Sequence, residues 1–300
     1  MIVNRISLMI EPTNRCNLKC PGCFSHLDGR KKRDMSFQEF MRIIDGNIDY
    51  IRNVSMFNFG EPLLNKDIYK MIKYAKHRGI KHVKLATNGM QLNEENITSL
   101  LDSKLDYLSV SLDGATPENY EKFRIGGDFN LVVGNIKNLV NRRDEIESQM
   151  KIEVQFIIMK HNENEIKMIE NLSKEIGADY LRLKRVYIKK NGYDYLLPER
   201  KAYNRYSNAP KMNSCKKPLE EIVINSDGSV IPCCFIVGDD MNNFSLGNAF
   251  EMKLKTILFG RKYKNFIKLC LENKSLLSCC EACQEGNINL DYKVIEFGRG

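Results

Sequence analysis

The chain has 300 residues, 43% of them hydrophobic and 28% charged, and its net charge is +8. No apolar run approaches the roughly 18–20 residues that span a bilayer, so we expect a globular protein with no membrane partner. The basic residues are spread over predicted helix faces and mostly alternate with acidic ones, which is typical of a solvated surface and gives no case for nucleic-acid binding.

Strand-like and helix-like segments alternate along the first 190 residues. Apolar runs rich in β-branched residues predict strands, and apolar residues at helical spacing predict helices. In chain order the predicted strands are Ile6–Glu11, Asn53–Phe59, His82–Thr87, Tyr107–Ser111, Lys151–Ile158 and Tyr180–Ile188. The predicted helices are Ser36–Tyr50, Lys66–Arg78, Glu94–Asp102, Pro117–Phe123, Leu131–Asp144 and Glu163–Ile176.

Local signals mark several helix ends. Ser36 is placed as an N-cap and Glu39 follows three residues later, the pattern of a capping box. Gly79 and Gly177 stand where the second and the last of these helices are expected to end.

Repeated βα units imply a parallel sheet with right-handed crossovers. Six units fit either an open doubly wound sheet or a curved, incomplete barrel, and periodicity does not choose between them. In both arrangements the ligand binds at the carboxyl ends of the strands. We therefore expect the functional residues directly after the strands.

The pattern changes after about residue 190. Asn191–Asn213 is rich in Tyr, Asn and Pro and is expected to be a connector. Glu221–Ile224 and Ser229–Ile231 flank Asp227-Gly228 and predict a β-hairpin. One helix is predicted over Lys253–Leu271. We expect a core domain at 1–190 and a smaller C-terminal domain, a hairpin plus a helix, at 191–300.

The ten cysteines fall into two groups, three at 16–23 and seven at 215–283. The N-terminus shows no basic region followed by an apolar stretch, so we expect a cytoplasmic protein. Disulfides are rare in a reducing compartment, and clustered thiols there indicate metal or redox chemistry. Cys16, Cys20 and Cys23 form a C-x3-C-x2-C set after the first strand. They suit either a cubane cluster with one open iron or a zinc site completed by His26.

This spacing, followed by the aromatic Phe24, resembles the signature of the radical S-adenosylmethionine (SAM) superfamily. The resemblance implies a partial (β/α)6 TIM-like barrel. It also implies a [4Fe–4S] cluster on Cys16, Cys20 and Cys23 whose open iron binds SAM. In that family one electron cleaves SAM to methionine and a 5′-deoxyadenosyl radical, which abstracts a hydrogen atom from the substrate. A flavodoxin or ferredoxin is the implied electron donor.

Motifs at the next strand ends support the resemblance. Phe59-Gly60-Glu61-Pro62 is similar to the family's Gly-Gly-Glu-Pro segment, with Phe59 in place of the first glycine. Thr87-Asn88-Gly89 matches a second motif, and Ser111-Leu112-Asp113-Gly114 with Arg124 a third. The resemblance implies that SAM contacts fall on Phe24, Gly60, Glu61, Thr87, Asn88, Ser111, Asp113 and Arg124. Each motif alone is a common turn sequence, but their occurrence at successive strand ends is specific.

The C-terminal cysteines resemble the SPASM/twitch domain of the same superfamily. Cys215-x12-Gly228-x4-Cys233, followed after a gap by Cys280-x2-Cys283, implies one auxiliary [4Fe–4S] cluster on these four cysteines. The Cys279-Cys280 doublet allows either residue as the ligand. A second auxiliary cluster is not expected, because no cysteine follows Cys283.

Three further cysteines remain, Cys234, Cys270 and Cys279. Free cysteines are most often small buried hydrophobes. A sharper alternative is that Cys234 or Cys279 donates a hydrogen atom to a substrate radical, as in an epimerase, and we retain both as catalytic candidates.

Three functions follow. The first is a radical SAM oxidoreductase, dehydrogenase-like, acting on a small natural-product or sugar-like molecule. The second is a peptide-modifying enzyme: a thioether-forming or crosslinking maturase, or an epimerase. Many maturases carry an N-terminal leader-binding domain, and the first strand is expected to start near residue 5, which favours the small-molecule interpretation. The third, a non-catalytic zinc-binding or nucleic-acid-binding protein, is disfavoured by the strand-end motifs.

Overall fold

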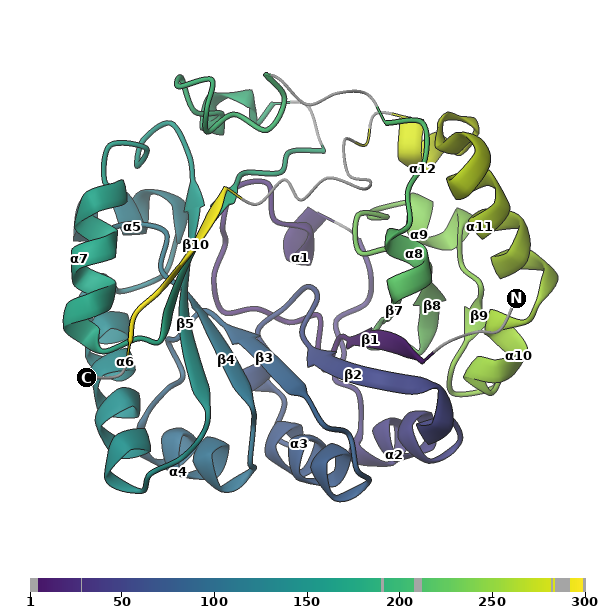
Figure 1. Cartoon of the computed structure of the whole chain (residues 1–300), viewed down its shortest axis with the longest axis horizontal. Helices are drawn as coiled ribbons and strands as arrows, with labels where there is room; N and C mark the ends of the chain where they lie inside the picture. Colours follow the sequence, from purple (N-terminus) through teal and green to yellow (C-terminus); the bar gives the residue numbers. More distant parts are fainter. Residues whose placement is uncertain are drawn as a thin grey trace. The chain divides into compact units, whose positions relative to one another are not determined.

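The computed structural model describes residues 5–27, 29–189, 192–207, 212–281, 283 and 292–298 (Figure 1). The chain divides into two compact units. The first unit combines Met1–Cys16, Phe24–Lys84 and Pro210–Asn289. The second combines Asn17–Cys23, Leu85–Ala209 and Leu290–Gly300. Each unit therefore draws on both halves of the sequence.

The sheet of the first unit is built around strand β1 (Ile6–Ile10). It pairs in parallel with β2 (Ile51–Met56) on one side and β7 (Glu221–Ile224) on the other. β7 pairs antiparallel with β8 (Ser229–Ile231), and β8 with β9 (Gly247–Asn248). The predicted hairpin is thus confirmed. Its pairing with β1 was not predicted, because that contact joins segments far apart in the sequence.

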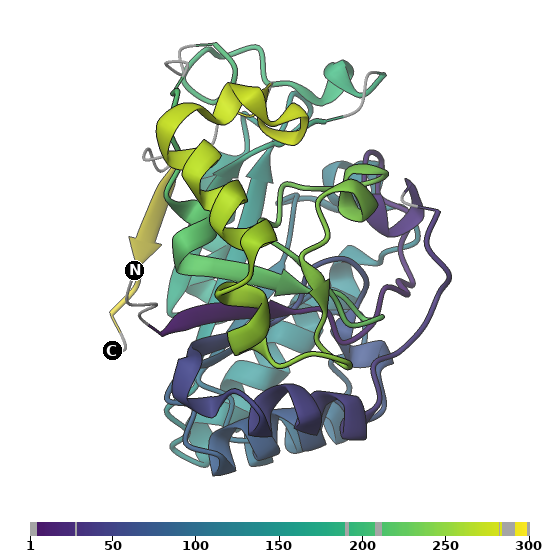
Figure 2. The same ribbon diagram turned by 90° about the vertical axis from the view of Figure 1, so that its right-hand side faces the viewer.

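The first unit holds helices from both ends of the chain. From the N-terminal half come α1 (Phe24–Leu27), α2 (Phe37–Asp45) and α3 (Ile68–His77). From the C-terminal part come α8 (Lys217–Glu220), α9 (Asp240–Asn243), α10 (Leu254–Leu258), α11 (Arg261–Asn273) and α12 (Ser278–Glu281). Figure 2 shows α11 running alongside the hairpin strands.

The start of α2 confirms the predicted capping box. The Glu39 amide donates to Ser36 Oγ at 3.3 Å, and the Ser36 amide donates to a Glu39 carboxylate oxygen at 2.8 Å. The helix is shorter than predicted and ends before Gly46. The buried Asn47 side chain donates to the Ile43 carbonyl at 2.7 Å and accepts from the Leu254 amide at 2.8 Å. These contacts fix a turn where the periodicity predicted more helix.

The prediction of one helix over Lys253–Leu271 is wrong. Gly260 takes an extended conformation (φ −69°, ψ 158°) and separates α10 from α11. A side chain there would begin 3.0–3.1 Å from the Thr256 and Ile257 carbonyl oxygens, which is too close for comfortable packing. The apolar faces of both helices are still buried, so the apolar periodicity ran through the break.

The second unit contains the remaining parallel strands. β3 (Val83–Thr87) begins in the first unit and ends in the second. β4 (Tyr107–Ser111), β5 (Lys151–Ile158) and β6 (Tyr180–Arg185) pair in parallel, and β10 (Lys293–Glu296) adds antiparallel to the edge of β6 (Figure 1). The unit's helices are α4 (Glu94–Asp102), α5 (Pro117–Phe123), α6 (Phe129–Glu145) and α7 (Ile166–Ile176). The bounds of α4, β4, α5 and β5 match the prediction, whereas β10 was not predicted.

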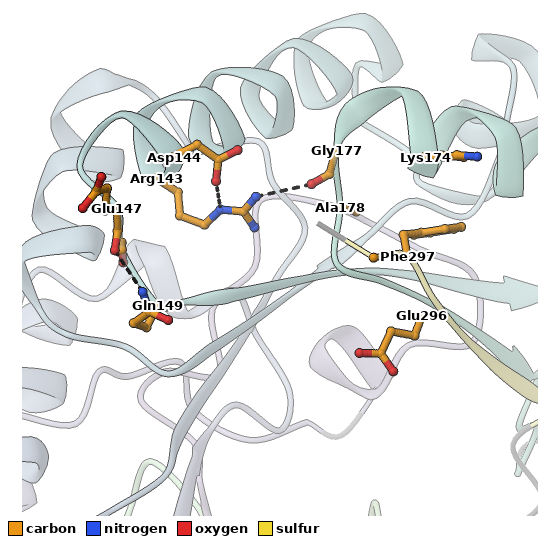
Figure 3. A pocket seen from close by; sticks show the side chains of 11 residues that line it. Arg143, Asp144, Glu147, Gln149, Lys174, Gly177, Ala178, Glu296 and Phe297 are labelled. Carbon is orange, nitrogen blue, oxygen red and sulfur yellow. Dashed lines mark hydrogen bonds and ion pairs between the residues drawn. The ribbon is translucent and has the colours of Figure 1, made fainter. Parts of the chain in front are cut away.

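Arg143 joins several elements of the second unit where their strands begin. Its side chain is 2% exposed. The guanidinium donates to buried Asp179 at 2.6 Å and to Asp144 at 2.7 Å. Asp179 also accepts from the Ile152 amide at 2.8 Å. Arg143 lines a cavity of about 890 Å³ together with Glu296 and Phe297. Figure 3 shows these side chains. Because this cavity lies at the amino ends of β5 and β6, it is not where parallel α/β sheets bind their substrates.

No helix among the described residues is long and apolar enough to cross a membrane.

Candidate active site

The loop after β1 carries the first cysteine set, and the segment after β2 holds its beginning in place. Gly60 has φ +86°, and a Cβ there would lie 2.3 Å from the Thr13 carbonyl oxygen and 2.8 Å from that of Arg15. Only glycine fits this approach. The Glu61 amide donates to the Arg15 carbonyl at 2.7 Å, directly before Cys16. Its buried carboxylate accepts from the Leu63 amide at 3.1 Å.

Phe59, which replaces the first glycine of the family's motif, makes an aromatic contact. Its ring packs against Phe24, with the centroids 5.8 Å apart and the planes tilted by 55°. Both rings are half-buried and pack on the apolar cluster that contains Met9 and Val223. The aromatic residue that follows Cys23 therefore contacts the residue that replaces the family's glycine.

The segment after β3 contacts the middle of the cysteine loop. The Asn88 side-chain amide donates to the Asn17 side-chain oxygen at 2.8 Å. Thr87 Oγ1 accepts from the Gly89 amide at 3.1 Å, which shapes this turn. Both Thr87 and Asn88 are buried. The turn is itself held by Asn135, whose side chain donates to the Gly89 carbonyl at 2.9 Å.

The segment after β4 reaches one of the cysteines. Arg124 Nε donates to the fully buried Asp113 carboxylate at 2.6 Å, and Arg124 Nη1 lies 3.9 Å from Cys20 Sγ as a donor. Asp113 also accepts from the Ile157 amide at 2.6 Å. Burial raises the pKa of the Cys20 thiol, and the charge of Arg124 opposes that rise. Ser111, at the end of β4, is half-buried.

Glu11, the residue between β1 and the cysteine loop, is bonded to the hairpin of the first unit. The Glu11 carboxylate is completely buried and accepts two hydrogen bonds from Arg30, at 2.8 and 2.9 Å. The same carboxylate accepts from the Ser226 amide in the hairpin turn at 3.0 Å. This contact between the first strand and the C-terminal region was not predicted, since it depends on long-range pairing.

Two of the C-terminal cysteines each accept a hydrogen bond from a backbone amide, which suits a bound thiolate. Burial raises the pKa of the Cys215 thiol, and the Lys217 amide, which donates to the sulfur, opposes that rise. Cys233 receives a similar hydrogen bond from the Phe235 amide, although its contact with Cys234 and its burial raise its pKa. Amide donors two residues after a cysteine stabilise a thiolate that binds a metal cluster.

The third predicted ligand, Cys280, lies in α12, and the fourth, Cys283, follows that helix. The Cys283 amide donates to the Cys280 carbonyl at 3.1 Å. Cys279 and Cys280 place their sulfurs 3.6 Å apart, so the structure leaves both as neighbours of this site. Cys270 approaches as well: its thiol pairs with Cys280, and its carbonyl accepts from the Cys215 amide at 2.7 Å. Sequence reasoning placed Cys270 outside the cluster region, because only tertiary packing brings it there.

The two catalytic candidates differ in exposure. Cys279 is 7% exposed and belongs to the apolar cluster of α11 and the hairpin. Cys234 is half-buried and packs on the edge of that cluster. Neither position tests a hydrogen-donor role, which stays a prediction.

The zinc alternative required His26 beside the three cysteines. His26 is exposed on α1. Within the part of the chain that the structure describes, no three Cys, His, Asp or Glu side chains are arranged to hold a single metal ion. Each thiolate of a cubane cluster binds a different iron, so cluster ligands need not converge on one point. The thiol sets with their amide and guanidinium donors fit iron–sulfur clusters.

Family models decide the identity of both regions. Residues 10–174, more than half of the chain, match the radical SAM superfamily. The chain belongs to this superfamily. Residues 215–284 match the SPASM iron–sulfur cluster-binding domain. These radical SAM and SPASM regions imply SAM and two [4Fe–4S] clusters as cofactors.

Similar proteins and structures agree with this assignment. A probable GTP 3′,8-cyclase of Methanococcus maripaludis is 32% identical over 176 residues, 57% of this chain and 56% of that protein. The match thus spans about half the length of this relative. SuiB of Streptococcus suis bound to SAM aligns with a TM-score of 0.73 and 19% identity over 95% of this chain and 73% of that chain. BtrN in complex with SAM and 2-DOIA aligns with a TM-score of 0.62 and 16% identity over 98% of this chain and all of that chain. These likenesses confirm the predicted α/β fold class, a partial barrel with a C-terminal SPASM-type domain.

Proposed function

We propose that this radical SAM enzyme cleaves SAM reductively and abstracts a hydrogen atom from a small natural-product or sugar-like substrate, in a dehydrogenase-like oxidation. Cys16, Cys20 and Cys23 hold the cluster that binds SAM. When bound, this cluster supplies the electron that converts SAM to methionine and a 5′-deoxyadenosyl radical. The chain's own residues hold the cluster loop, orient SAM and keep the site dry.

One observation carries the proposal: each strand-end motif touches the cysteine loop. Glu61 bonds to Arg15, Asn88 to Asn17 and Arg124 to Cys20. Turns of these sequences are common by themselves. Within the second unit, Asn88 and Arg124 contact the same short cysteine segment, which supports a SAM site there.

The residues of the motifs have separate proposed roles. Arg124 is fixed by its ion pair with Asp113, so its guanidinium is preorganised to face anionic groups. Gly60 brings backbone close to the loop, and Glu61 adds a buried carboxylate for the SAM ammonium. The other proposed SAM contacts are Phe24, Thr87, Asn88 and Ser111.

In the C-terminal region, Cys215, Cys233, Cys280 and Cys283 are the proposed ligands of the auxiliary [4Fe–4S] cluster. Four thiolates fill every iron, so this cluster serves electron transfer or shapes the substrate pocket. We propose 1–190 as the radical SAM core and 191–300 as the auxiliary-cluster domain.

The small-molecule substrate is supported by the likeness to BtrN over its whole chain. BtrN was crystallised with the small molecule 2-DOIA. A peptide substrate is the second candidate, supported by the likeness to SuiB. The structure of SuiB bound to its precursor peptide SuiA aligns with this chain with a TM-score of 0.72. A flavodoxin or ferredoxin in the cytoplasm is the proposed electron donor.

Anaerobic protein tests the assignment of the two cluster sites. We expect about eight iron per wild-type chain, since two cubanes carry four each. With SAM and dithionite, wild type should form 5′-deoxyadenosine, and Cys16→Ala, Cys20→Ala or Cys23→Ala should abolish it. Cys283→Ala is the matched control: it should keep SAM cleavage but stop substrate turnover. Zinc without visible absorbance would exclude the enzyme proposal, and full turnover by Cys283→Ala would exclude the auxiliary ligand set.

Deuterium transfer distinguishes the two substrate classes. Candidate sugar-like small molecules and candidate peptides, each deuterated at carbon, are incubated with enzyme, SAM and reductant. Deuterium in 5′-deoxyadenosine from the small molecule and none from the peptide is expected. Transfer from the peptide alone would replace the small-molecule proposal by the peptide one.

A further inference from the structure

Lys274 is buried at an unusual place. It stands where α11 ends and the short turn Lys274–Leu276 begins, and it is 3% exposed. Lysines are almost never fully buried unless their charge is compensated.

The contacts of Lys274 place it between the first and the last cysteine of the auxiliary set. Its amide donates to the Asn213 carbonyl at 2.8 Å, two residues before Cys215. Its ammonium donates to the Cys283 carbonyl at 2.9 Å. Through its backbone amide and its ammonium, this one residue thus contacts the segments that carry both ends of the set.

The expected cluster is negatively charged and would attract the Lys274 ammonium. An oxidised [4Fe–4S] cluster with four thiolates carries a net charge of about −2, and reduction adds one more negative charge. A buried ammonium interacts with such a charge more strongly than an exposed one, because water screens it less. Net charge and local polarity are among the factors that set the reduction potential of a cluster.

We propose that Lys274 is the internal counter-ion of the auxiliary cluster, holding the Cys215 and Cys283 segments together and raising the cluster's reduction potential. This inference rests on the proposed function, since it assumes the auxiliary ligand set. Lys274 acts through charge and position and does not touch substrate. It is a positioning residue.

Lys217 is the nearest rival for this role. Its positive charge also interacts with Cys215 and Cys233. Its side chain is only half-buried, and its ammonium sits 5.5 Å from the centroid of the Phe235 ring. Solvent screens a half-exposed ammonium more than a buried one, so Lys274 is the lysine tested here.

The test compares three variants of the holoenzyme. Lys274→Met removes the charge and keeps the length, while Lys274→Arg keeps the charge. Lys264→Met removes the same charge from an exposed position on α11 and is the matched control. Iron per chain is measured first. The auxiliary cluster is then titrated electrochemically by its electron paramagnetic resonance signal, with SAM added to identify the signal of the other cluster.

We expect a more negative midpoint potential for the auxiliary cluster in Lys274→Met than in wild type. Lys274→Arg and Lys264→Met should stay near the wild-type value, and the SAM-responsive cluster should keep its potential in every variant. Loss of auxiliary iron in Lys274→Met that Lys274→Arg prevents would also support the counter-ion, because charge then decides occupancy.

Three results would overturn the inference. They are an unchanged potential in Lys274→Met, an equal shift in Lys264→Met, or loss of auxiliary iron in both Lys274 variants, which would indicate a packing role alone. Wild-type protein without auxiliary iron would instead refute the ligand set, and the counter-ion with it. The initial iron measurement separates that failure from the other three.

Discussion

The two cysteine regions of this protein are organised in different ways. Cys16, Cys20 and Cys23 lie close together in the sequence, and backbone and polar contacts from three strand ends hold their loop. The C-terminal cysteines are spread over Cys215–Cys283, and five of the seven lie in or against the apolar cluster that includes Phe266 and Leu277. Local sequence therefore brings the cysteines of the first region together, whereas tertiary packing assembles the second.

This difference predicts different sensitivities. Changes in backbone fit or hydrogen bonding should disturb the first region. Loss of apolar volume should disturb the second, because its cysteines come together only if α11, α12 and the hairpin pack.

The largest effect is expected from Phe266→Ala. Phe266 is 5% exposed, packs in the apolar cluster and contacts the Phe244 ring at a centroid distance of 5.9 Å. Removing a buried phenylalanine side chain costs about 3–5 kcal/mol. We expect a lower unfolding midpoint and loss of auxiliary iron, with 5′-deoxyadenosine formation retained. Denaturant unfolding and iron analysis measure both effects.

Phe259→Ala is the control for that variant. Phe259 is 38% exposed, and truncating an exposed side chain changes stability by about 0.5 kcal/mol. If both variants lose auxiliary iron equally, packing around Phe266 does not assemble the second region.

Gly60→Ala probes the first region. Alanine there has a left-handed backbone, which costs about 1–2 kcal/mol, and its Cβ also collides with the Thr13 and Arg15 carbonyls. We expect loss of SAM-cluster iron and of SAM cleavage, with auxiliary iron retained. Iron analysis and 5′-deoxyadenosine assays measure this.

Gly79→Ala separates backbone strain from the collision. Gly79 has nearly the same φ of +87°, but nothing lies within 4 Å of the position that a Cβ would take there. The substitution should therefore cost only the backbone strain and leave both clusters in place. SAM-cluster loss in Gly79→Ala as well would show that general instability, and not the contact with the loop, removes the cluster.

The same contrast explains what the sequence could predict. The bounds of α4, β4, α5 and β5 follow from local periodicity and caps, and the strand-end motifs follow from short sequence patterns. The β1–β7 and β6–β10 pairings join distant segments, so no local pattern contains them. Gly260 breaks a helix whose apolar periodicity continues through the break. Lys274 has no sequence signal, because its burial between Asn213 and Cys283 exists only in the folded chain.

The smallest effect concerns the polar support of the first region. Glu39 accepts from the Ser36 amide and from Arg33 at 2.7–2.8 Å, and the Arg33 amide donates to Asn14 in the cysteine loop at 2.8 Å. Burial raises the pKa of Glu39, but these hydrogen bonds outweigh it and lower the pKa below its usual value. The ionised carboxylate thus stabilises the folded state.

Glu39→Gln should therefore destabilise the protein by about 1 kcal/mol near pH 7, the usual value of a helix cap. Because the folded-state pKa is lowered, this contribution is complete above the unfolded pKa of about 4.3 and is lost as the pH falls through the folded value. Urea unfolding of wild type and Glu39→Gln from pH 7 downward should show a difference that holds to about pH 5 and then shrinks. A constant difference at every pH would mean that shape, and not charge, supports the loop.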